Sequence, residues 1–181
     1  MNHKVLIEKN RVRFVFAVHI ILFLVAFTQI IRKMFSIQKK EKTMVYQKHI
    51  TIETTGVKDL NNITNEVTNI ISNSGIKTGI VHIFNIGSTG CIGAMEFEPG
   101  LEKDIITILD KLIPPSSSYK HELTWHDKNG HSHLQATILG PELTVPITKG
   151  QPVLGVWQQI FHLECDIKPH TRNIMITVMG E

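Results

Sequence analysis

Cysteine is scarce in this 181-residue chain: Cys91 and Cys165 lie far apart in the sequence, and neither belongs to a C-x-x-C pair. Two separate cysteines are typical of a protein from a reducing compartment, where they usually lie buried as small apolar groups. We therefore expect a cytoplasmic protein. The sequence by itself gives no support for a disulfide between the two thiols.

Positive charge is also scarce in the larger part of the chain. Residues 44–181 carry ten Lys and Arg against fourteen Asp and Glu, whereas residues 1–43 carry nine against two. The formal net charge of +3 therefore comes from the N-terminal segment. A protein that binds nucleic acid generally needs a basic face to contact phosphates. The mildly acidic part of the chain argues against such a partner.

The N-terminal segment contains one long uncharged run, FVFAVHIILFLVAFTQII at residues 14–31, with Arg and Lys on both sides. Such a run is just long enough to span a bilayer as a helix, and no small-x-small cleavage site follows it. One interpretation is a transmembrane anchor that holds the main domain on the cytoplasmic side, because the downstream flank is richer in basic residues. The other is an upstream start codon that the cell does not use. Both interpretations separate a hydrophobic, basic extension (1–43) from a compact domain (44–181).

The domain alternates between strand and helix patterns. Period-two and β-branched segments predict strands at 48–54, 79–85, 91–97, 143–147, 153–165 and 173–179. Apolar residues at helical spacing predict helices at 63–74 and 101–112. The fold class is therefore α+β, with mainly antiparallel strands in a sandwich and two or three packed helices.

The third helix is one of two interpretations of a histidine-rich stretch, Tyr119–Gly140, which reads YKHELTWHDKNGHSHLQATILG. A hairpin with its turn at 127–130 would place three histidines on one face, where they would cluster. A helix over 131–139 would instead end at the Gly-Pro pair that follows it. That stop signal and the spacing of the apolar residues favour the helix.

Four motifs together resemble the YjbQ family (uncharacterised family UPF0047), in its archaeal-type form. They are GSTGCIGAMEFEPGLEKD, YKHELTWHDKNGHSHLQATILGPELTVPI, LGVWQQIFHLECD, and P-x-x-R before a final strand that ends in Gly. The resemblance runs from about Met44 to Glu181, which favours Met44 as the natural start. It implies a compact α+β trimer with a polar site near the subunit contacts. Some members show weak thiamine-phosphate synthase activity, which joins a pyrimidine diphosphate to a thiazole phosphate.

The resemblance and the chemistry of the side chains together indicate which residues form the site. As catalytic residues we expect His133, Asp127 and His126. A divalent metal (zinc, manganese or magnesium) would be bound by imidazole and carboxylate groups, drawn from His126, His131, His133 and Glu96. A small phosphorylated ligand would contact Gly87, Ser88, Thr89, Asn129, Trp157, Gln158 and Arg172. The alternative function is a non-catalytic trimer that binds a metal or a small anion.

Three positions depart from the family pattern. Gly87 stands where the common bacterial form has histidine, and we expect His126 or His131 to compensate for the loss. His170 stands where the family usually has the first of two arginines, so that only Arg172 remains. Val156 replaces the usual threonine. The first two departures weaken the expectation that the site matches that of the family in detail.

Overall fold

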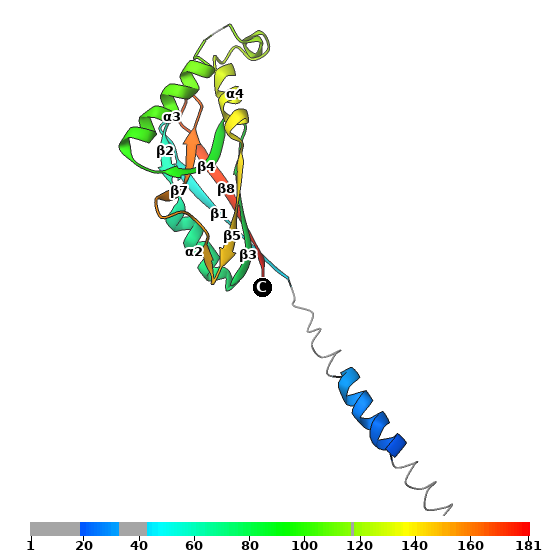
Figure 1. Ribbon diagram of the computed structural model, residues 1–181. Helices are drawn as coiled ribbons and strands as arrows, with labels where there is room; N and C mark the ends of the chain where they lie inside the picture. Colours follow the sequence, from blue (N-terminus) through cyan, green and yellow to red (C-terminus); the bar gives the residue numbers. More distant parts are fainter. Residues whose placement is uncertain (1–18, 33–42, 117) are drawn as a thin grey trace, which may run out of the picture. The chain divides into compact units, whose positions relative to one another are not determined.

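The computed structural model describes residues 19–32, 43–116 and 118–181. They divide between two units, Met1–Lys42 and Thr43–Glu181. In the first unit, residues 19–32 form a helix (Figure 1). The side chains of this helix are exposed. No helix in the described part of the chain is both long and apolar enough to cross a membrane. The predicted membrane segment begins at residue 14, outside the described residues, so the role of residues 1–43 stays a prediction.

Two antiparallel sheets form the second unit. The larger sheet has the strand order β1 (Met44–Glu53), β8 (Thr171–Gly180), β3 (Thr78–Ile86), β5 (Glu142–Thr148) and β6 (Gln151–Pro152). The smaller sheet has the order β2 (Leu60–Asn62), β7 (Gln158–Glu164) and β4 (Gly90–Glu96). The predicted α+β class with antiparallel strands is therefore confirmed.

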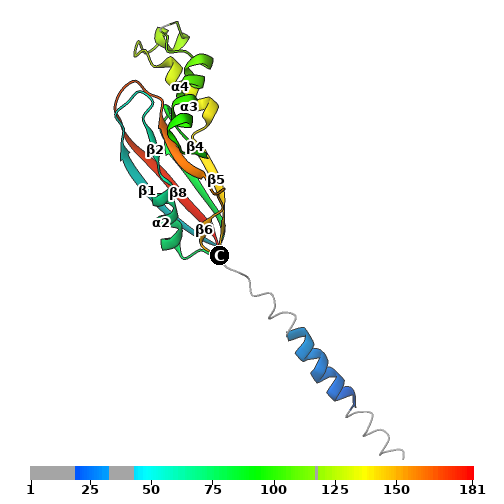
Figure 2. The same ribbon diagram turned by 60° about the vertical axis from the view of Figure 1, so that its left-hand side comes forward.

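Three α-helices and one short 3₁₀ helix accompany the sheets: α2 (Thr64–Ser74), α3 (Pro99–Leu112), η1 (Lys120–Leu123) and α4 (Gly130–Leu139). Figure 2 shows α3 and α4 at one end of the unit and α2 at the other. Of the two interpretations for the histidine-rich stretch, the helix is correct and the hairpin is wrong. The predicted strand at 153–165 is wrong at its start, because residues 153–157 form a loop before β7.

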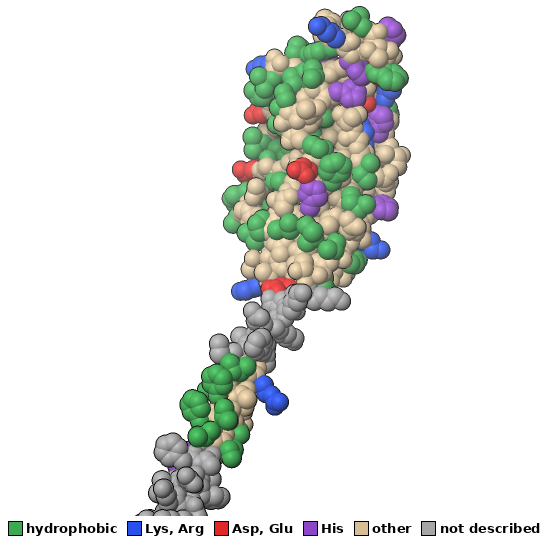
Figure 3. All heavy atoms as spheres, turned by 90° about the vertical axis from the view of Figure 1, so that its right-hand side faces the viewer, with side chains coloured by type: hydrophobic (Ala, Val, Ile, Leu, Met, Phe, Trp, Pro, Cys, Tyr) green, Lys and Arg blue, Asp and Glu red, His purple; other side chains and the backbone are tan. Residues whose placement is uncertain are grey.

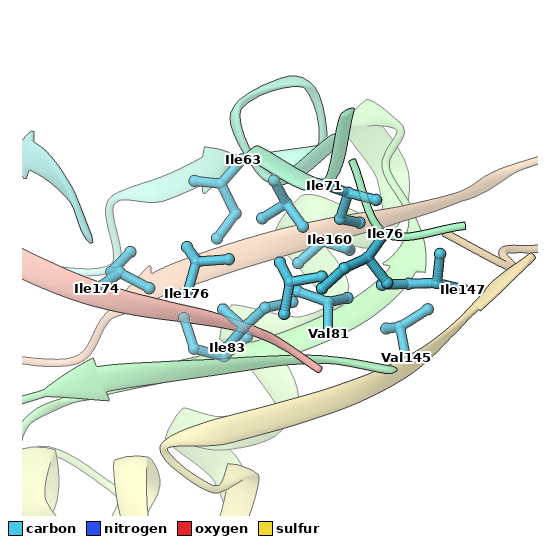
Figure 4. Close-up of a cluster of buried hydrophobic side chains, with 13 residues drawn as sticks. Ile63, Ile71, Ile76, Val81, Ile83, Val145, Ile147, Ile160, Ile174 and Ile176 are labelled. Carbon is cyan, nitrogen blue, oxygen red and sulfur yellow. The ribbon is translucent and has the colours of Figure 1, made fainter. Parts of the chain in front are cut away.

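The main core lies between the two sheets and α2 (Figure 4). Strand β8 contributes Ile174, Ile176 and Val178, every second residue, and α2 contributes Val67 and Ile71, which lie one helical turn apart. All five side chains are fully buried. Burying each one contributes about 1.5–3 kcal/mol relative to exposure, so this cluster holds the two sheets together.

Strand β7 is buried on both faces, and its two faces differ in chemistry. Phe161 and Leu163 point into a second apolar cluster that α3 and α4 cover. The alternate residues of the strand point the other way. Ile160 enters the main core, while His162 and Glu164 contact polar side chains of the larger sheet. At one end of the sandwich the core therefore becomes polar.

Candidate functional site

A buried ion pair joins the two sheets at this polar end. Arg172 of β8 donates from Nε and Nη2 to the two carboxylate oxygens of Glu164 of β7, at 2.6 and 2.5 Å. Glu164 also accepts hydrogen bonds from the Thr54 hydroxyl and the Asp166 backbone N–H. Burial alone would raise the pKa of Glu164, but the hydrogen bonds from Arg172 and Asp166 outweigh it and lower that pKa. The carboxylate is therefore ionised, and the pair fixes the direction of the guanidinium group.

Asp166 extends this network towards the helices. Its carboxylate accepts from the Thr89 hydroxyl at 3.1 Å and lies 3.0 Å from His170 Nε2. Burial would raise the pKa of Asp166, but these bonds and the backbone N–H of Ile167 lower it overall. His170 thus provides a partner for an anionic side chain.

Hydrogen bonds from the Asn85 side chain fix the loop between β3 and β4. The Asn85 amide nitrogen donates to the carbonyl oxygens of Gly87 and Gly90, at 3.1 and 3.0 Å. The peptide bonds are trans, so a carbonyl and the N–H of the next residue point in opposite directions. Because the Gly87 carbonyl points inward, the N–H of Ser88 points away from Asn85. The loop therefore offers a backbone donor on its outer side.

His162 supports this loop from the opposite sheet. Its Nε2 lies 3.2 Å from Asn85 Oδ1, and a Cβ added at Gly90 would lie only 2.7 Å from the same nitrogen. Burial lowers the pKa of His162 to about 4. A neutral imidazole therefore sits under the loop, and the position at residue 90 has no room for a side chain.

A pocket of about 160 Å³ opens beside this loop. It lies between the β3–β4 loop, α4 and the start of β5, and its lining consists of Gly87, Ser88, Gly90, His133, Ala136, Thr137 and Pro141. Arg172 Nη1 lies close to Gly87: a Cβ added at Gly87 would be 2.8 Å from it. The pocket thus combines a backbone donor, hydroxyl groups, an imidazole and a nearby guanidinium.

His133 does not act alone on the pocket wall. The ring of His121, from η1, lies against it with a centroid separation of 4.6 Å, and His121 Nε2 is 3.3 Å from Asp127 Oδ1. The hydrogen-bond network assigns the Asn129 amide nitrogen towards Asp127 and His121, at 2.9 and 3.1 Å. Two imidazoles and one carboxylate therefore lie in contact, a set that can hold and pass a proton.

Glu122 keeps this set in place. Its buried carboxylate accepts from the backbone N–H groups of Lys128 and Gly130, at 2.6 and 3.1 Å. It thereby caps the N-terminus of α4 and ties η1 to that helix. The sequence predicted neither η1 nor a role for His121, although His121 belongs to the same histidine-rich stretch.

The predicted ligand-binding residues separate into two groups. Gly87 and Ser88 line the pocket, and Thr89 and Arg172 belong to the network below it. Trp157 and Gln158 lie at the other end of β7, where Gln158 is opposite Glu96. These two are therefore distant from the pocket of their own chain.

The predicted metal ligands are not brought together. His133 lines the pocket, whereas His131 is buried on the same helix, where burial and Lys58 lower its pKa. His126 is exposed in the loop before α4, and Glu96 lies at the far end of β4. Across the described ranges, no group of three or more His, Cys, Asp or Glu side chains is placed to hold one metal ion.

Residues 48–181 match the family model described as "UPF0047 protein YjbQ-like". The chain belongs to the YjbQ family. A UPF0047 protein of Methanothermobacter thermautotrophicus is 37% identical over 137 residues, which cover 76% of this chain and 94% of that protein. A UPF0047 protein of Archaeoglobus fulgidus is 32% identical, with coverage of 72% and 98%.

Solved YjbQ-family structures have the same fold. A YbjQ-like protein from Sulfolobus solfataricus superposes with a TM-score of 0.74 at 41% identity and covers 77% of this chain and 100% of its own. A hypothetical protein from Aeropyrum pernix gives 0.70 at 29% identity, with coverage of 75% and 99%. The Sulfolobus protein is described as being of unknown function. Membership therefore establishes the fold, and the chemistry has to be inferred from the site.

Proposed function

We propose that the pocket binds a small phosphorylated molecule and that the YjbQ-like domain is an enzyme of thiamine-phosphate synthase type. The observation that carries the proposal is the β3–β4 loop, which Asn85 holds so that the Ser88 N–H faces away from the interior. Backbone donors in a glycine-rich loop are a recurrent way to bind phosphate oxygens. The His133 imidazole lies in the same pocket and supplies a group that can carry positive charge.

In this reaction the thiazole nitrogen attacks a carbon of the pyrimidine substrate, and the bond from that carbon to the diphosphate breaks. The diphosphate gains negative charge as the bond breaks, so donors placed around it lower the barrier. Ser88 and His133 line the pocket, and the guanidinium of Arg172 lies next to Gly87. We assign this role to the Ser88 N–H, His133 and Arg172. We assign no step to a metal, because the predicted ligands do not form a set.

His121 and Asp127 would support His133 in two ways. The contact between the rings fixes the orientation of His133, and the carboxylate of Asp127, 3.3 Å from Nε2 of His121, holds His121 in turn. A protonated imidazole next to the departing diphosphate forms a charge-assisted hydrogen bond, which is stronger than a neutral one. His121 is in this respect a positioning residue for His133.

A coupled assay with the pyrimidine diphosphate and the thiazole phosphate tests the activity. We expect product from the wild type, a loss of at least tenfold in His133→Ala, and no change in His49→Ala, which alters an exposed histidine of β1. Wild-type turnover no higher than that of His133→Ala would contradict the proposed reaction.

The alternative is a non-catalytic protein that binds a small anion in the same pocket. The pocket has a volume of about 160 Å³. Pockets for small molecules usually measure roughly 300–1,000 Å³, so this pocket is small. Thermal shifts with inorganic pyrophosphate separate the two cases. Stabilisation that disappears in His133→Ala, without turnover, would favour the alternative.

We further propose that the domain acts as a trimer in the cytoplasm. Val156 and Trp157 are 88% and 72% exposed at one end of β7, and a tryptophan this exposed is typical of a contact surface. Apolar side chains also lie between the histidines on the face shown in Figure 3. Contact between two different surfaces of neighbouring copies gives a closed ring when the rotation that relates the copies closes. Light scattering should report a trimer that Trp157→Ala weakens; a monomeric wild type would contradict it.

A further inference from the structure

The two cysteines of the chain are neighbours in space. Strand β4 pairs Cys91 with Leu163 of β7, and Cys165 follows two residues later, where its backbone N–H donates to the Thr89 carbonyl. Alternation along β7 puts both side chains on the face covered by α3 and α4. Their sulfur atoms lie 3.7 and 4.0 Å from one acceptor, the Leu163 carbonyl oxygen. Both cysteines are free and at most 1% exposed.

The two thiols are chemically unequal. The neighbouring Cys91 side chain lowers the pKa of Cys165, and Lys58 lowers it further. The neighbouring Cys165 side chain and burial raise the pKa of Cys91. Lys58 is itself buried, bonded to Gln135 and 3.3 Å from Asp110. The two shifts have opposite signs, so Cys165 is the more acidic of the two adjacent thiols.

We propose that Cys91 and Cys165 form a reversible redox pair that closes to an intramolecular disulfide. The oxidant is a hydroperoxide, which reaches the buried pair when the elements that cover it, α3 and α4, open locally. The Cys165 thiol loses its proton, and the thiolate attacks one peroxide oxygen and breaks the O–O bond, which gives a sulfenic acid at Cys165. The departing oxygen takes up a proton, equal to the one that the thiol lost, and leaves as water or an alcohol. The Cys91 thiol then attacks the Cys165 sulfur and displaces water. The two sulfurs lose two electrons in total, the peroxide gains them, and a dithiol reductant reverses the change.

Closure of the disulfide would link the two segments that meet at the polar network. Gly90 precedes Cys91 and ends the pocket loop, and Asp166 follows Cys165 and binds Thr89. A covalent link between β4 and the segment after β7 would also shorten a long loop of the unfolded chain, which stabilises the fold. Oxidation of this pair is independent of the reaction proposed for the pocket.

Mass spectrometry of the full chain tests the redox pair. After treatment with hydrogen peroxide, the denatured protein should be lighter by about 2 Da, should contain no thiol that alkylates, and should regain both thiols with dithiothreitol. Proteolysis should yield one peptide pair joined through Cys91 and Cys165. The oxidised protein should melt on the order of 10 °C above the reduced protein.

The single variants Cys91→Ala and Cys165→Ala show which sulfur reacts first. We expect Cys91→Ala to trap a sulfenic acid at position 165 that a dimedone probe labels, and Cys165→Ala to give little labelling. The wild-type mass does not depend on how well the variants fold. Two thiols that stay alkylatable after oxidation, sulfinic or sulfonic products without a disulfide, or a purely intermolecular disulfide would each overturn the proposal.

Discussion

Acidification should destabilise the domain at His162, which is fully buried between the sheets. Asn85 uses its amide nitrogen to donate to Gly87 and Gly90, so its Oδ1 must accept, and Nε2 of His162 must carry the proton. The other ring nitrogen, Nδ1, is then unprotonated and has no hydrogen-bond partner within the described structure. Protonation of Nδ1 would give the buried ring a positive charge and an N–H group without a hydrogen-bond acceptor.

The magnitude follows from the pKa of His162, which burial lowers to about 4. In the unfolded chain the value is about 6.5. Each pKa unit corresponds to about 1.4 kcal/mol, so the difference is worth about 3 kcal/mol. Between these two values the unfolded state binds more protons. The contribution is therefore fully present above about pH 6.5 and is lost as the pH falls towards about 4.

Urea unfolding of the wild type and of His162→Gln, followed by circular dichroism between about pH 7 and pH 4, measures this contribution. The glutamine amide can replace the Nε2 donor but does not titrate. We expect the difference in the free energy of unfolding between the two proteins to change by about 3 kcal/mol across the range, in favour of the variant at low pH. His49→Gln, at an exposed histidine, should show no such change. A difference that is independent of pH would refute the reasoning.

Three further substitutions test the packing around the site. Glu164→Gln removes the charge that pairs with buried Arg172 and should lower the free energy of unfolding by roughly 3–5 kcal/mol in urea titrations; a loss below about 1 kcal/mol would mean that the pair is solvated. Gly90→Ala places a Cβ 2.7 Å from His162 Nε2 and should cost about 1–3 kcal/mol by the same measurement. Ile71→Ala, in the core under α2, should cost about 2–5 kcal/mol and lower Tm, and an unchanged Tm would contradict this packing.

Regular patterns made the framework of the fold predictable. Strand β8 alternates Ile174, Ile176 and Val178 with more exposed residues, and the structure buries these three. The spacing of Val67 and Ile71 likewise predicts the buried face of α2 correctly. In both elements one face meets the core along its whole length, so a local pattern determines the burial.

The polar network was not predictable, because its members meet only through strand pairing. Asn85 lies on a strand of the larger sheet, whereas His162 and Glu164 lie on a strand of the smaller sheet. In the sequence, each of the three looks like a single polar residue next to apolar ones. Two antiparallel sheets must form in the right register before these side chains face each other. The sequence therefore shows Arg172 and Glu164 in two of the family-type motifs, but gives no sign that the two side chains form a pair.

The expected metal cluster is inconsistent with the helix that the same sequence favours. Successive residues on an α-helix are about 100° apart, so His131 and His133 differ by about 200° and face opposite sides. In the structure one is buried and the other lines the pocket. Only the hairpin would have brought them together with His126. Adopting the helix therefore removes the basis for a ligand set that includes both.

The expectation that His126 or His131 compensates for the missing histidine at position 87 stays a prediction, and the structure adds Arg172 as a second candidate. A Cβ at Gly87 would lie 2.8 Å from Arg172 Nη1, and Glu164 holds that guanidinium through two bonds. A side chain at 87 therefore requires Arg172 Nη1 or the loop to shift. We infer that Arg172 supplies positive charge next to Gly87. Gly87→Ala should then weaken the stabilisation by pyrophosphate in thermal shifts at least as much as Ser88→Ala, which leaves the backbone donor in place. Undiminished stabilisation of Gly87→Ala would return the role to a histidine.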